Sequence, residues 1–130
     1  VRILINASQN GANALYATYD TTANKLYLFN DAGNALLGGF APGSANVISN
    51  SQGSLNCAST TVAGNPTANS ITVGWNFTPA SGFTGTKYVY AYATDKENAV
   101  APWLSMGYWA IQAVTSPHEM SPPAGSVNLQ

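Results

Sequence analysis

Apolar residues recur at every second position in several short stretches of this chain, most regularly between residues 71 and 78. In that stretch the apolar positions are Ile71, Val73, Trp75 and Phe77. Because side chains alternate between the two faces of a β-strand, the pattern predicts a strand with these four residues buried. Thr72 and Asn76 fall on the opposite face, which we expect to be exposed.

Other segments show the same two-residue alternation, and clusters of Gly, Asn, Ser and Pro separate them. This alternation predicts strands over residues 1–6, 13–20, 25–30, 35–37, 45–49, 54–62, 70–78, 86–94 and 106–114, with a loop over 95–104. No stretch has the 3.6-residue period of a helix. Short alternating strands separated by turn residues are typical of an antiparallel sandwich. The sequence therefore predicts an all-β fold, an immunoglobulin-like antiparallel β-sandwich of about seven to nine strands with an extended Pro-rich C-terminal tail.

Charged residues are scarce. The chain has four Lys/Arg and five Asp/Glu in 130 residues and a net charge of −1, whereas about a quarter of the residues of an average domain are charged. This balance disfavours nucleic acid as a partner, and no apolar run approaches the roughly 20 residues of a membrane span. A neutral surface rich in Asn, Ser and Thr suits packing against copies of itself or against a neutral polymer.

The chain divides into a domain over residues 1–114 and a tail over 115–130. The tail contains Pro117, Pro122 and Pro123, which favour an extended linker, and it ends with the alternating pair Val127 and Leu129. That alternation indicates the beginning of another strand. Val1 lies inside a predicted strand, which favours a processed form or a piece of a longer protein.

Several stretches resemble a family of bacterial immunoglobulin-like repeats found in large secreted or surface proteins. They are residues 26–33 (LYLFNDAG), 48–52 (ISNSQ), 83–87 (FTGTK), 92–95 (YATD) and 107–109 (GYW). The resemblance implies an extracellular or cell-surface location and supplies no catalytic residue. Such repeats often carry a cysteine pair near positions that are Leu15 and Gly53 here. Cys57 is the single cysteine, and we expect it to be buried and unbridged.

The first functional hypothesis is a structural or interaction module of an extracellular fibre or repeat array. A sandwich that lacks its first strand exposes unpaired backbone groups, and a strand from another copy can fill the gap. The tail residues that would serve this self-assembly are Pro122, Pro123, Val127 and Leu129. The partner would then be a homo-polymer or tandem copies of the chain itself. The alternative is that the tail folds back on its own domain.

The second hypothesis is carbohydrate binding, with a neutral polysaccharide as partner. Tyr88, Tyr90 and Tyr92 form one row on a predicted strand, and Trp103 lies in the predicted loop beside it. Exposed rings of this kind stack on sugars. The opposite row, Val89, Ala91 and Ala93, is also apolar, which leaves open that this row faces the core instead. Because tyrosine is commonly part-buried, an interior position is favoured for the three tyrosines. Trp75 and Trp109 are expected in the core.

Enzymatic chemistry has little support. The single histidine, His118, lies in the tail, and Asp95 and Glu97 share a loop with Lys96. Acid–base catalysis needs such groups together in a pocket, and calcium needs six or more oxygen ligands. We therefore expect no catalytic residue, no metal site and no cofactor. The triplets at Asn6 and Asn76 match the N-glycosylation motif, which a chain rich in Asn, Ser and Thr also produces by chance.

Overall fold

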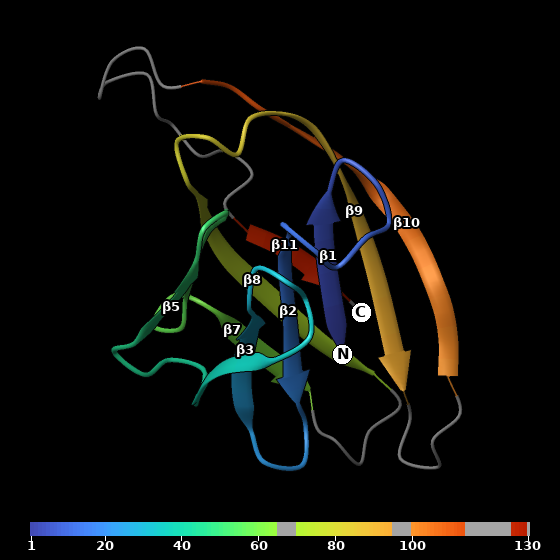
Figure 1. Cartoon of the computed structure of the whole chain (residues 1–130). Helices are drawn as coiled ribbons and strands as arrows, with labels where there is room; N and C mark the ends of the chain where they lie inside the picture. Colours follow the sequence, from blue (N-terminus) through green and yellow to red (C-terminus); the bar gives the residue numbers. More distant parts are fainter. Residues whose placement is uncertain (65–69, 95–99, 114–125, 130) are drawn as a thin grey trace.

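The computed structural model describes residues 1–64, 70–94, 100–113 and 126–129 (Figure 1). This part of the chain contains eleven β-strands and no helix. In chain order they are β1 (Arg2–Asn6), β2 (Leu15–Asp20), β3 (Lys25–Phe29), β4 (Leu36–Phe40), β5 (Val47–Asn50), β6 (Gly53–Asn56), β7 (Thr61–Gly64), β8 (Ile71–Pro79), β9 (Gly85–Thr94), β10 (Val100–Ile111) and β11 (Ser126–Leu129). The pairings between them are antiparallel, so the all-β prediction is confirmed.

The strands form two sheets that share one core. The first sheet has the order β10-β9-β1-β2-β3-β4, and the second has the order β11-β8-β6-β5, with β7 also paired to β8. An immunoglobulin sandwich places its seventh, sixth and third strands in one sheet, with extra strands beyond the third in the variable type, and its second, fifth and fourth strands in the other. The observed order agrees if β1 is read as the third strand. β11 then lies in the place of the second strand, although it comes last in the chain.

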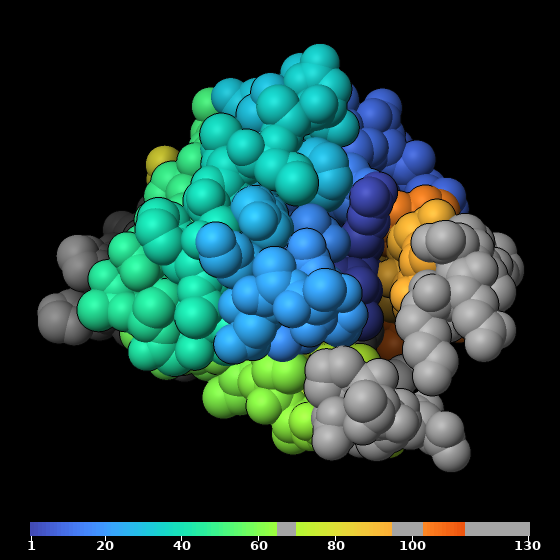
Figure 2. Space-filling view, turned by 90° about the horizontal axis from the view of Figure 1, so that it is seen from below, coloured from blue at the N-terminus to red at the C-terminus, as the bar shows by residue number. Residues whose placement is uncertain are grey.

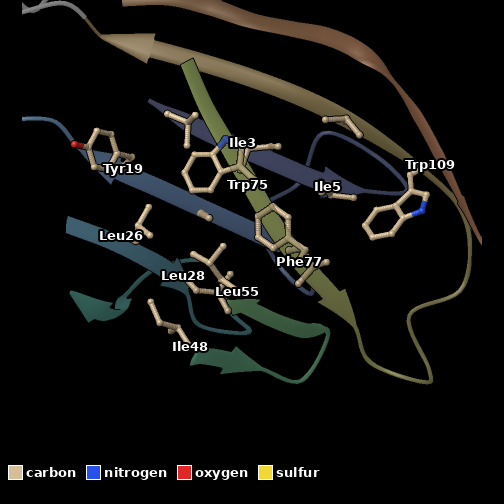
Figure 3. Packing of buried hydrophobic residues seen from close by; sticks show 14 of the residues in the cluster. Ile3, Ile5, Tyr19, Leu26, Leu28, Ile48, Leu55, Trp75, Phe77 and Trp109 are labelled. Atoms are coloured by element: carbon tan, nitrogen blue, oxygen red, sulfur yellow. The ribbon is translucent and has the colours of Figure 1, made fainter. Parts of the chain in front are cut away.

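The core lies between the sheets, as the period of two predicts. Val73, Trp75 and Phe77 are fully buried on β8, and Ile71 is half-buried at its end. Figure 3 shows Trp75 and Phe77 among residues of the first sheet, including Ile3 and Leu28. Thr72 and Asn76 are half-buried rather than exposed. The physical reason is that β8 is a central strand with partners on both edges, which cover its outer face in part.

On the β4–β5 side the two sheets meet closely. Gly38 has a φ of +92°, and a Cβ added to it would come within 2.3 Å of Ile48 Cδ1. A residue with a side chain would both strain the backbone and displace this core residue. Figure 2 shows this end of the molecule, with the β2–β3 turn (light blue) beside the β4–β5 segment (teal to green).

Two strand predictions need correction. Residues 54–62 form two strands, β6 and β7, because the chain leaves β8 in a turn at residues 57–60. The Thr60 hydroxyl donates to Asn56 O at 2.7 Å and accepts from the Asn76 backbone N–H at 3.3 Å. The Thr60 hydroxyl therefore supplies a hydrogen-bond acceptor to β8 at the gap between β6 and β7. Thr60 is the one polar residue that is fully buried among those described.

The last hairpin is longer than predicted. β10 begins at Val100, so residues 100–104 are strand and not loop, and its pairing with β9 shifts register twice. A bulge admits an extra residue into a strand, and this breaks the strict alternation that identifies strands from sequence. With β7 and β11 added to the predicted strands, the described residues form eleven strands, more than the seven to nine that we expected.

Hydrogen bonds from Asn50 and Ser51 join the two sheets near the β3–β4 loop. Ser51 donates to the Asp31 carboxylate through its backbone N–H (2.8 Å) and its hydroxyl (2.6 Å). Asn50 Nδ2 donates to Ala14 O and Phe29 O, both at 3.0 Å. Two of the stretches that resemble the bacterial repeats, 26–33 and 48–52, are therefore bonded to each other.

Candidate functional site

The first candidate site is the edge of β8 that β11 occupies. Ser126, Val127, Asn128 and Leu129 pair with Asn76, Trp75, Gly74 and Val73. The tail strand thus belongs to the second sheet of its own chain, as the fold-back alternative describes. Pro122 and Pro123 lie outside the described residues. Val127 and Leu129 lie in β11, opposite Trp75 and Val73 in the ladder.

β11 is the outermost strand on its side of the second sheet. It is four residues long and covers only residues 73–76 of the nine-residue strand β8. Without it, the backbone groups of β8 on this edge would have no partner among the described strands. Such an edge is a template for any extended strand that can reach it.

The second candidate site is the outer face of the first sheet. Val89 is buried in the core, so its neighbours Tyr88 and Tyr90, together with Tyr92, lie on the opposite, outward face. The interior position favoured for this tyrosine row is therefore wrong. The pairing of β9 with β1 explains the result. Val89 is opposite the core residue Ile5, and because side chains alternate along a strand, this pairing decides which residues of β9 face the core.

The part of this face around Tyr90 and Tyr92 is covered by aromatic side chains. Tyr16 stacks on Phe29 with ring centroids 3.9 Å apart, and Trp103 packs against Tyr92 at 5.0 Å and against Tyr16 at 5.9 Å. Tyr90 and Trp103 are half-buried against the cluster that Tyr16 and Phe29 form with Leu4 and Ala14. Trp103, which we expected to be exposed in a loop, is instead part of β10 and of this cluster.

Arg2 lies across the same cluster. Its guanidinium carbon is 5.5 Å from the Phe29 centroid and 5.6 Å from that of Tyr92, and Nη1 donates to the Tyr16 hydroxyl at 3.0 Å. Cation–π contacts of this kind hold the planar group over the rings. Arg2 therefore covers the Tyr92 end of the row.

The open part of the face lies at the other end of the row. Tyr88 is 44% exposed and Tyr108 is 71% exposed, and the two are directly opposite each other in the β9–β10 ladder. Tyr108 was not among the predicted contact residues. The available signal was its alternation with Trp109, since a core position for Trp109 in the predicted strand places Tyr108 on the outer face.

Neither glycosylation triplet lies in a freely accessible loop. Asn6 Nδ2 donates to Asn10 O at 2.8 Å and to Ala12 O at 3.0 Å. A glycan on this nitrogen would require the loss of at least one of these bonds. Asn76 is half-buried in the middle of β8, where its backbone N–H donates to Thr60 and its neighbour in the ladder is Ser126.

The chemistry available elsewhere is limited. Cys57 is buried and unbridged, as expected, and burial raises the pKa of its thiol. Within the described ranges no three His, Cys, Asp or Glu side chains gather as metal ligands would. Asp95, Glu97 and His118 lie outside those ranges.

No family model, no curated protein and no solved structure matches this chain. Membership in the bacterial immunoglobulin-like repeats therefore stays a prediction. Among the described residues there is no helix with the length and hydrophobicity that a membrane crossing needs.

Proposed function

We propose that this chain is a structural and interaction module of an extracellular fibre or of a cell-surface repeat protein. In this proposal it self-associates head to tail, with β11 of one copy pairing to β8 of the next. It carries out no catalysis. One observation carries the proposal: the last strand fills a place that an immunoglobulin sandwich gives to a strand preceding β1.

The pairing within one chain and the pairing between chains use the same ladder. Between copies, the contact is head to tail, and such a contact propagates unless it closes into a ring. The strand within the chain competes at an effective concentration on the order of 1 mM, because a short linker tethers it. Exchange is therefore favoured by high local concentration, as in a tandem array or on a surface.

Cysteine pairs can distinguish the two pairings. Ser126 and Asn76 are opposite in the β8–β11 ladder, at a distance that a disulfide can span. One tagged variant carries Ser126→Cys and a second, differently tagged variant carries Asn76→Cys. Cys57 is kept in both, since it is buried. We expect a disulfide between the two variants under mild oxidation, in a yield that rises with protein concentration.

The control replaces Asn76→Cys with Thr22→Cys, in the exposed turn between β2 and β3, and should give only background cross-linking. A single chain that carries both Ser126→Cys and Asn76→Cys measures the pairing within the chain. If that double variant closes its internal disulfide while the mixture gives none even near 1 mM, the order of the tether's effective concentration, strand exchange is wrong.

Carbohydrate binding is a second candidate, favoured by the exposed pair Tyr88 and Tyr108. Aromatic stacking on a sugar ring contributes about 1 kcal/mol per ring, or several-fold in affinity. We expect neutral polysaccharide cast in a native gel to retard the protein, and Tyr108→Ala to reduce the retardation. Val47→Ala, at an exposed apolar residue of β5, is the matched control. Equal mobility with and without polysaccharide would exclude this candidate.

A further inference from the structure

The turn between β1 and β2 contains Asn10 followed by Gly11, the single Asn-Gly pair in the sequence. We propose that Asn10 is a site of spontaneous covalent modification, in which the Gly11 backbone nitrogen displaces the side-chain amide of Asn10. This modification is independent of the proposed function, because it depends on the geometry of this turn alone.

The reaction needs only water. The Gly11 nitrogen attacks Asn10 Cγ, a C–N bond forms, and a five-membered imide closes. The Cγ–Nδ2 bond breaks, and Nδ2 leaves as ammonia after the Gly11 amide proton has passed to it through solvent. Water then opens the imide at either carbonyl, which gives aspartate or β-linked isoaspartate. No atom is oxidised or reduced, and the attack is intramolecular, which favours it over hydrolysis by solvent.

Three features of the turn favour the attack. Asn10 is exposed, so water and base reach it. The Gly11 N–H donates to no acceptor in the described part of the chain, so no hydrogen bond must break before it reacts. The Ala12 N–H donates to Asn10 Oδ1 at 2.9 Å. This oxygen takes the negative charge in the tetrahedral intermediate, and a donor already aimed at it stabilises that charge.

Asn50 and Ser51 provide a comparison within the same molecule. The Gln52 N–H donates to Asn50 Oδ1 at 2.9 Å, so the same kind of donor is present. However, both reacting nitrogens are held: Asn50 Nδ2 donates to two backbone carbonyls, and the Ser51 N–H donates to Asp31 Oδ1 at 2.8 Å. The two turns therefore differ in two respects. Among the residues that the structure describes, hydrogen bonds hold the side-chain amide and the attacking nitrogen only at Asn50, and the residue after the asparagine is Gly11 in one turn and Ser51 in the other.

The modification changes both charge and geometry. The net charge moves from −1 to −2 when one amide becomes a carboxylate, which is a large relative change for this chain. Isoaspartate also adds a methylene group to the backbone, and this displaces Asn10 O from Asn6 Nδ2, now 2.8 Å away. Asn6 is opposite Tyr88 in the β1–β9 ladder, so the change occurs beside the exposed tyrosine pair.

The test follows the folded full chain in mildly alkaline buffer by ion exchange and by mass spectrometry of its tryptic peptides. We expect an acidic form heavier by one mass unit, located at Asn10 in the peptide of residues 3–25. Its rate should exceed that at Asn50 by at least about tenfold. The Asn10→Ser variant keeps an acceptor oxygen for the Ala12 N–H but has no amide, and it should form no acidic product at this position.

A synthetic peptide of residues 6–14 separates the effect of the turn from that of the sequence alone. We expect the folded chain to react at least as fast as this peptide. An unchanged mass at Asn10, equal rates at Asn10 and Asn50, or a folded chain slower than the peptide by about tenfold would each overturn the proposal.

Discussion

Among single residues, Asp31 has the clearest electrostatic role, because it ties a loop of the first sheet to a turn of the second. The hydrogen bonds from the Ser51 hydroxyl and from the Ser51 backbone N–H lower the pKa of its carboxyl group. A pKa that is lower in the folded than in the unfolded chain stabilises the fold when the group is ionised. This contribution is complete above the unfolded pKa of about 3.9 and is lost as the pH falls through the folded value.

We therefore predict that Asp31→Asn lowers Tm at neutral pH and that the difference in Tm from the unmodified chain shrinks below about pH 4. Thermal unfolding followed by circular dichroism between neutral and acidic pH checks this. Ser51→Ala keeps the backbone donor and removes the hydroxyl, so it should give a smaller loss. Parallel Tm curves for the two chains over the whole pH range would contradict the prediction.

Among the strands, the break between β6 and β7 shows how one side chain can replace a missing ladder contact. Residues 54–62 read as one continuous strand, and nothing in their period indicates a turn. The turn forms because the Thr60 hydroxyl satisfies the Asn76 N–H that the departing strand no longer reaches. The hydrophobic period of a sequence does not show where a side chain will replace a backbone acceptor. The boundary between β6 and β7 could therefore not be predicted.

Replacing Thr60 by Val, which has almost the same shape, should lower the free energy of unfolding by about 1 kcal/mol, since it removes the hydroxyl acceptor of the part-buried Asn76 N–H. Thr60→Ser keeps the hydroxyl and should cost less than Thr60→Val. Urea denaturation measures both. If the serine variant is the less stable of the two, packing of the methyl group and not the hydrogen bond determines the role of Thr60.

For the whole molecule, the sequence predicts the class of fold and the core face of β8 but not the topology. Alternation along a strand shows which residues share a face. It does not show which sheet the strand joins, and that depends on pairings between distant segments. The tyrosine row illustrates the limit: both faces of β9 carry apolar residues, so only the pairing of Val89 with Ile5 decides that Tyr88 faces outward. Tyr108 differs, because the predicted core position of Trp109 already implied that its neighbour faces outward.

We predict that a chain without residues 121–130 is less stable and does not assemble, because the edge of β8 loses its strand at residues 73–76. Urea denaturation and analytical ultracentrifugation measure the two effects. A synthetic peptide of residues 121–130 added in trans should restore stability in proportion to its concentration. Assembly of the shortened chain at the normal level would show that β11 has no part in it.

The position of β11 in the chain also affects when the second sheet is completed during synthesis. β8 is complete well before its partner strand, since the whole β9–β10 hairpin is made between them. At roughly 5–20 residues per second, the edge of β8 stays open for seconds on the ribosome. In the strand exchange proposed above, this interval is when β11 of a neighbouring copy meets no competing strand from the same chain at the edge of β8.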